Sequence, residues 1–164
     1  MIELLQQLEN MSFPTWIRTD PSTFAFAGIL LLHTIGMGII VGVSAGIDLR
    51  ILGLAPAIRL APLEKFLPVL WFGFWINAIT GTLLFIADAS SKATNPDFWV
   101  KMAFVALAVI NLRMLKTQVF RDPQIDKGGL STHQKILAAT SLFLWLGAIT
   151  AGRLLAYVGQ SNGF

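Results

Sequence analysis

Residues 21–47 read PSTFAFAGILLLHTIGMGIIVGVSAGI, a stretch of 27 residues without Asp, Glu, Lys or Arg. A second uncharged stretch, FLPVLWFGFWINAITGTLLFIA, covers the 22 residues 66–87. Both exceed the roughly 20 residues that a helix needs to cross the hydrocarbon core of a bilayer. The two stretches therefore predict an integral membrane protein built from helices.

Two further stretches are apolar but contain basic residues. Residues 136–152 carry no charge over 17 positions, and the chain stays apolar to residue 158 apart from Arg153. Residues 98–120 include Lys101 and Arg113, whose long side chains can reach towards the membrane surfaces. We therefore predict an all-α, up-down-up-down bundle over residues 21–159, with spans at about 21–47, 66–88, 98–119 and 136–158.

The composition supports this class and excludes others. Only 13% of the residues are charged, against roughly 25% in soluble domains. The absence of Cys excludes disulfides, thiolate metal sites and cysteine nucleophiles. No Ser–His–acid arrangement, phosphate loop or H-E-x-x-H motif occurs, which argues against an enzyme. The basic residues flank apolar stretches, so the pI of 9.6 reflects membrane topology and not nucleic acid binding.

The distribution of basic residues predicts an orientation. The connections at 48–65 and 113–135 together hold eight Lys and Arg residues, and the opposite side holds four. By the positive-inside rule, both connections are expected in the cytoplasm, and the N- and C-termini are expected on the periplasmic side.

The first 20 residues do not resemble a signal peptide, because Glu3 and Glu9 stand where a basic start is expected. We predict an amphipathic helix on the outer surface that ends at Pro14. Its apolar face comprises Met1, Leu4, Leu5, Leu8 and Met11. Residues 160–164 are expected to form a short tail.

Several polar residues near the centres of the spans are expected to lie at the same depth in the membrane. His33, Asn77 and Asn111 lie near the middle of the first three spans, with Trp75 and Trp145 at similar depth. These five residues are the candidate binding pocket, with haem b, a quinone or a metal near His33 as the possible ligand. The alternative is a structural histidine that hydrogen-bonds Asn77 or a carbonyl group.

Small residues form stripes on the first two spans. Gly73, Asn77 and Gly81 recur every fourth residue, which favours close contact with another helix. Gly38, Gly42 and Gly46 form a second stripe that faces away from His33. This second stripe meets either a helix of the same chain or a helix of a second copy or another subunit.

Charged residues near the span ends suggest two interhelical ion pairs. Asp88 and Arg153 lie towards the outer side, and Asp48 and Arg113 lie towards the inner side. The pairs would either line a proton or ion path or simply compensate partly buried charges. Asp48 could instead pair with Arg50 or contact water.

Four segments resemble an uncharacterised family of bacterial four-helix inner-membrane proteins. They read HTIGMGIIVGVSAGIDLRILGL (33–54), WFGFWINAITGTLLFIADA (71–89), NPDFWVKMAFVALAVINLRML (95–115) and SLFLWLGAITAGRLLAYVG (141–159). The resemblance implies a bacterial inner-membrane location without an assigned activity. A looser similarity extends to CopD-type copper-resistance membrane domains and four-helix b-type cytochromes. It implies a haem or copper that only His33 could bind, but Lys116 replaces a histidine that relatives often carry.

Together these patterns favour a non-catalytic, multi-pass accessory or assembly subunit of a larger membrane complex. Its expected partners are the lipid bilayer and a second copy or another membrane subunit. One alternative is an electron-transfer or ligand-handling protein that uses His33. Another is a small transporter, which would need a polar path between the two expected ion pairs.

Overall fold

The structure is a computed structural model that describes residues 2–19, 24–121, 125–126 and 129–161. Four long helices dominate it: α3 (Phe24–Leu52), α4 (Leu67–Ile86), α6 (Pro96–Leu115) and α7 (Thr132–Ser161). The described residues contain no strand. By length and composition, four segments are suited to span a membrane, at 25–52, 61–86, 96–120 and 132–155. The predicted all-α fold, with four helices long and apolar enough to span a membrane, is confirmed.

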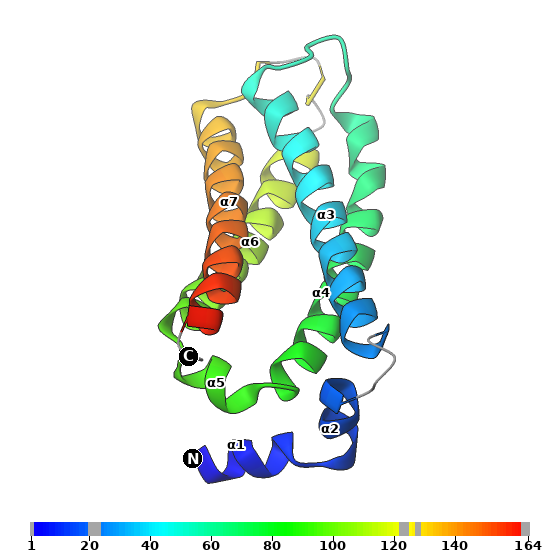
Figure 1. Cartoon of the computed structure of the whole chain (residues 1–164). Helices are drawn as coiled ribbons and strands as arrows, with labels where there is room; N and C mark the ends of the chain where they lie inside the picture. The colour runs from blue at the N-terminus through cyan, green and yellow to red at the C-terminus, as the bar shows by residue number, and fades with distance from the viewer. Residues whose placement is uncertain (1, 20–23, 122–124, 127–128, 162–164) are drawn as a thin grey trace.

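The four helices form two antiparallel hairpins (Figure 1). α3 packs mainly on α4, α6 packs mainly on α7, and contacts between α3 and α7 join the hairpins. α4 and α6 meet near their ends, where the Phe85 and Phe98 rings stack at 5.1 Å and the Arg113 guanidinium lies 5.9 Å from the Trp71 ring. We call the end where α3 ends and α7 begins the inner end, and the opposite end the outer end.

The first span extends further than expected at the inner end. α3 continues to Leu52, so Asp48 and Arg50 belong to the helix and not to the connection. The chain then turns at Gly53, whose φ of +106° is a left-handed conformation that suits glycine. The connection continues through the 3₁₀ helix η1 (Ala61–Phe66) into α4. The start predicted at residue 21 lies outside the described residues.

The third and fourth spans begin and end near the predicted positions. Asn95 caps α6, because its side chain accepts a 2.8 Å hydrogen bond from the Asp97 N–H, and Pro96 occupies the first turn. The π-helical turn η2 (Lys116–Phe120) prolongs α6. α7 extends to Ser161, beyond the tail boundary expected at 160, and residues 162–164 lie outside the described residues.

A carboxylate joins the two inner connections. Asp126 Oδ1 accepts a 2.8 Å hydrogen bond from the Leu60 N–H, and Asp126 Oδ2 lies 3.3 Å from Arg59 Nε. The Leu60 N–H holds the pKa of Asp126 below its ordinary value, because a donor stabilises the ionised carboxylate. Two loops that are distant in sequence thereby hold one another at the inner end.

The N-terminal segment differs from the prediction. It forms two short helices, α1 (Ile2–Glu9) and α2 (Ser12–Thr19), instead of one helix stopped by Pro14. Pro14 fits within the first turn of α2, where backbone N–H groups lack helical partners in any case. Met1 lies outside the described residues. The exposed apolar side chains of this segment are Leu4, Leu8, Met11, Phe13 and Trp16.

The short helix α5 (Ala89–Thr94) links α4 to α6 at the outer end. Figure 1 shows α1 lying across this end beneath α5, and the two helices contact one another. The last turns of α7 reach the same end, so α1 and the end of α7 lie on one side of the bundle. This arrangement agrees with an even number of crossings.

Candidate functional site

His33 and Asn77 contact one another across α3 and α4. Asn77 Nδ2 donates a 2.8 Å hydrogen bond to the His33 carbonyl oxygen. His33 Nδ1 lies 3.1 Å from the Asn77 carbonyl oxygen and 3.1 Å from Thr80 Oγ1. Because a carbonyl can only accept, these contacts assign the ring proton to Nδ1. His33 is thus held in place by α4.

Glycines make this close contact possible. A Cβ atom on Gly73 would lie 2.7 Å from Ile39 Cγ2, and one on Gly36 would lie 2.9 Å from backbone atoms of α4. A Cβ atom on Gly81 would lie 3.1 Å from His33 Cε1. The structure therefore places Gly73 and Gly81 on the face of α4 that packs against α3. The sequence did not single out Gly36, although its spacing from His33 places it one turn away.

Lys101 of α6 packs against α7. A Cβ atom on Gly152 of α7 would lie 3.6 Å from Lys101 Cδ. We define the outer polar layer as His33, Asn77 and Thr80, which come from α3 and α4. The sequence assigned Lys101 only a position near the membrane surface.

Asn111 does not belong to this layer, which corrects the expected pocket. Its Nδ2 donates a 3.0 Å hydrogen bond to the Leu137 carbonyl oxygen of α7. Asn111 faces α7, on which α6 mainly packs, and no described hydrogen bond joins it to His33. The sequence predicted that these residues lie at a similar depth in the membrane. It did not predict the rotation of each helix about its axis, which decides the neighbour that each side chain contacts.

The two tryptophans also lie away from His33. Trp75 is 60% exposed and faces outwards from the bundle. Trp145 is only 3% exposed and lines a separate groove of about 240 Å³ between α3 and α7, together with Val41, Ala45, Leu142, Leu146 and Ile149. Its indole Nε1 is buried without a hydrogen-bond partner among the described residues. The five predicted pocket residues are therefore not assembled into one pocket.

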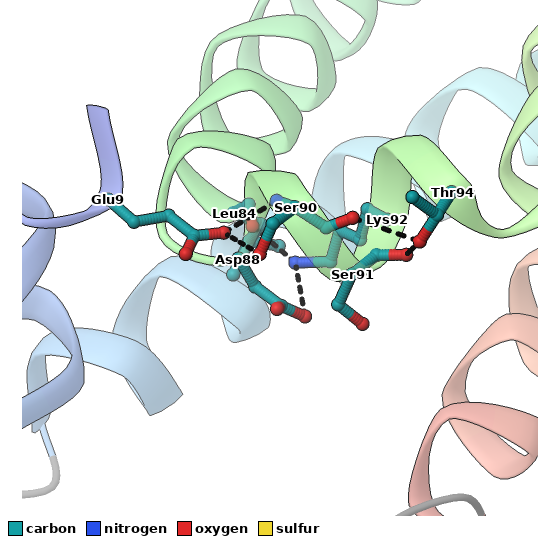
Figure 2. Close-up of polar contacts among 7 residues, drawn as sticks. All are labelled: Glu9, Leu84, Asp88, Ser90, Ser91, Lys92 and Thr94. Carbon is teal, nitrogen blue, oxygen red and sulfur yellow. Dashed lines mark hydrogen bonds and ion pairs between the residues drawn. The ribbon is translucent and has the colours of Figure 1, made fainter. Parts of the chain in front are cut away.

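The expected Asp88–Arg153 ion pair is not formed. Asp88 Oδ2 instead lies 3.7 Å from Lys92 Nζ, one helical turn away, while Lys92 Nζ also donates to the Leu84 carbonyl oxygen (Figure 2). Burial lowers the pKa of Lys92, and the charge of Asp88 offsets part of that effect. Arg153 is exposed on α7. The sequence did not predict the short helix α5. This helix places Lys92 one turn after Asp88, so Asp88 pairs with Lys92 and not with Arg153.

A second contact in Figure 2 was missed from the sequence. Glu9 Oε1 accepts a 2.8 Å hydrogen bond from Ser90 Oγ and a 2.5 Å hydrogen bond from the Ser90 N–H. Glu9 is buried at the end of α1, and Ser90 lies in the first turn of α5. A carboxylate is favoured there because the first N–H groups of a helix lack internal partners. The contact attaches the N-terminal segment to the bundle.

The expected Asp48–Arg113 pair is not formed either. Asp48 is buried between α3 and α7, where Ser44 Oγ donates a 3.1 Å hydrogen bond to Asp48 Oδ2. Ser44 Oγ also lies 3.1 Å from Ser141 Oγ of α7. Arg113 points towards Trp71 of α4. We define the inner polar layer as Ser44, Asp48 and Ser141; eleven residues of α3, or about 16 Å, separate Ser44 from His33.

The second glycine stripe is open. A Cβ atom on Gly38, Gly42 or Gly46 would meet nothing within 4 Å among the described residues. All three glycines are exposed. Gly42 and Gly46, but not Gly38, border a groove of about 280 Å³ that is also lined by Val43, Ile47, Leu63 and Phe66. We call Gly38, Gly42 and Gly46 the α3 glycine face.

The described residues hold no group of three or more His, Cys, Asp or Glu side chains that could bind a metal ion. Comparison with protein-family models, curated proteins and solved structures finds no match to the chain. Function is therefore inferred from the α3 glycine face and the two polar layers.

Proposed function

We propose that this chain is a non-catalytic membrane subunit that assembles with another transmembrane helix through the α3 glycine face. The supporting observation is that some glycines of the chain lie against a neighbouring helix or side chain, whereas those of the α3 glycine face do not. Gly36, Gly73, Gly81 and Gly147 each lie against a neighbouring helix or side chain, at 2.5 to 3.1 Å from an added Cβ atom. Gly38, Gly42 and Gly46 have no such neighbour among the described residues.

The exposed glycines of the α3 glycine face are suited to close packing against a partner helix. In lipid, helix association depends on close van der Waals packing, and a small-xxx-small stripe lets two backbones approach. An interior helical glycine otherwise costs up to about 1 kcal/mol relative to alanine. Three such residues along one face of α3 are explained if a partner helix occupies the adjacent groove.

The proposed location is the inner membrane of a bacterium, with both termini on the periplasmic side. The excess of basic residues in the connections at the inner end supports this orientation. The resemblance to bacterial four-helix inner-membrane proteins supports the location.

The experiment replaces Gly42 with Leu and measures assembly size in mild detergent and in native membranes. We expect the assembly to become smaller, because a leucine side chain keeps the partner backbone away. If the purified wild-type chain forms a dimer on its own, the partner is a second copy. A heterologous partner would instead be lost from complexes isolated from native membranes.

Gly28→Leu is the matched control. Gly28 is also open on α3, but it lies ten residues, or about 15 Å, before Gly38. We expect this variant to keep the wild-type assembly size. An unchanged assembly in Gly42→Leu, or an equal loss in both variants, would refute a specific contact at the α3 glycine face.

A further inference from the structure

Asp48 is an acidic side chain buried within a membrane-spanning helix. Only 1% of its surface is exposed, and it lies four residues before the end of α3. Ser44 Oγ donates to its carboxyl group at 3.1 Å, and Ser141 Oγ lies 3.1 Å from Ser44 Oγ. The carboxyl group thus ends a short chain of hydroxyl groups that crosses from α7 to α3.

Among the described residues, no basic side chain forms an ion pair with Asp48. Both ion pairs among the described residues involve other acids, Asp88 and Asp126. Arg50 of α3 donates to the Ile58 and Pro56 carbonyl oxygens, and Arg113 of α6 lies over Trp71. α4 contains no charged residue. On α7, His133 and Lys135 are exposed, and Ser141 contacts Ser44, the residue that donates to Asp48.

A buried carboxylate without a counter-charge is unstable in a medium from which water is excluded, so it must acquire one positive charge. A metal ion fits poorly. Hard cations such as Mg²⁺ and Ca²⁺ take about six to eight oxygen ligands, and the inner polar layer offers side-chain oxygens from three residues that already hydrogen-bond. A divalent ion would also leave a net positive charge. A single proton neutralises the carboxylate and fits between these oxygens.

We propose that Asp48, Ser44 and Ser141 form a proton-binding site near the inner end of the bundle. A proton from water at the inner end adds to a carboxylate oxygen of Asp48 and forms an O–H bond. Release reverses that step, and no other bond changes. The Ser44 hydroxyl positions the carboxyl group in both states. The site lies on α3 beside α7, so its occupancy does not depend on the assembly proposed above.

Infrared spectroscopy of the protein in lipid nanodiscs tests the site. At about pH 6 an ordinary aspartate is ionised, so a carboxylic C=O band from Asp48 should stand out. We expect the band to disappear in Asp48→Asn and to persist in the control Asp97→Asn, which changes a residue at the outer end. Transfer to D₂O should shift the band to lower frequency, because the proton exchanges with water.

Ser44→Ala tests the positioning role. Loss of its hydrogen bond should move the Asp48 band to higher frequency without abolishing it. If Asp48→Asn does not fold, the wild-type band in protein carrying ¹³C-labelled aspartate and its shift in Ser44→Ala replace that variant. Absence of an Asp48 band at about pH 6, or a band that does not shift in D₂O, overturns the proposal. A band that appears only when Na⁺ is removed would assign the site to a cation instead.

Discussion

The side-chain amide of Asn77 donates a 2.8 Å hydrogen bond to the His33 carbonyl oxygen, while the His33 ring donates back to the Asn77 carbonyl group across 3.1 Å. Each residue therefore serves the backbone of the other. The reciprocal contact joins α3 to α4 where Gly36 and Gly73 bring the two helices close together. It makes His33 part of the structural contact between these helices.

Asn77→Ala should destabilise the α3–α4 hairpin. Hydrogen bonds between membrane helices contribute about 0.6 kcal/mol on average and up to about 1.7 kcal/mol, and this substitution removes the donor to the His33 carbonyl. We expect a loss of about 1 kcal/mol in the free energy of unfolding, measured by denaturant titration in mixed micelles. Thr82→Ala on the exposed side of α4 is the control. Equal stability of the two variants would contradict the role of Asn77.

Gly73→Ala should be more damaging than its size suggests. The added methyl group would lie 2.7 Å from Ile39 Cγ2, so α3 and α4 must move apart. Overpacking of this kind costs roughly 1 to 3 kcal/mol. In Gly28→Ala the methyl group meets open space, and the higher helix propensity of alanine should leave stability unchanged or slightly increased. The same denaturant titration distinguishes the two outcomes, and a Gly73→Ala protein as stable as wild type would argue against this close contact.

The visible absorption spectrum of the purified protein tests the ligand-handling alternative. His33 Nδ1 already contacts α4, so only Nε2 could bind a haem iron, and Asn77 Nδ2 lies 3.5 Å from that atom. We expect no Soret band. A Soret band that is lost in His33→Ala would show haem binding and would replace the assembly proposal with an electron-transfer function. A quinone is tested separately by extracting the purified protein with organic solvent.

The contact between Asp126 and Leu60 should respond to pH. The pKa of Asp126 is lowered in the folded protein, so its stabilising contribution is complete above the unfolded value of about 3.9. This stabilising contribution is lost as the pH falls through the lowered pKa that Asp126 has in the folded protein. We expect the NMR signal of the Leu60 amide to shift only below about pH 4.

Two variants separate the sources of this pH response. Asp126→Asn should abolish the titration of the Leu60 amide signal. Arg59→Ala should retain most of it, because the Arg59 side chain is 76% exposed and exposed ion pairs contribute little. A Leu60 signal that titrates normally in Asp126→Asn would show that another group causes the shift.

Several features of the fold were predictable because they depend on local sequence. Transfer of a helix into lipid depends on the composition of a window of about 20 residues, so residues 21–47 and 66–87 predicted spans without any tertiary information. The Asn95 cap of α6 was equally local, since its partner is the N–H of Asp97, two residues away. The contact of His33 with Asn77 was anticipated as one alternative, because polar groups at membrane depth need partners.

The direction in which each helix faces was decided by the tertiary structure. Asp48 and Arg113 are suitable partners by charge and depth, yet one faces Ser44 and the other faces Trp71. Asn111 likewise faces α7, because α6 packs on α7 rather than on the α3–α4 hairpin. Hydropathy measures only depth in the membrane. Helix rotation and pairing depend on which surfaces pack most closely, and that property belongs to the assembled helices.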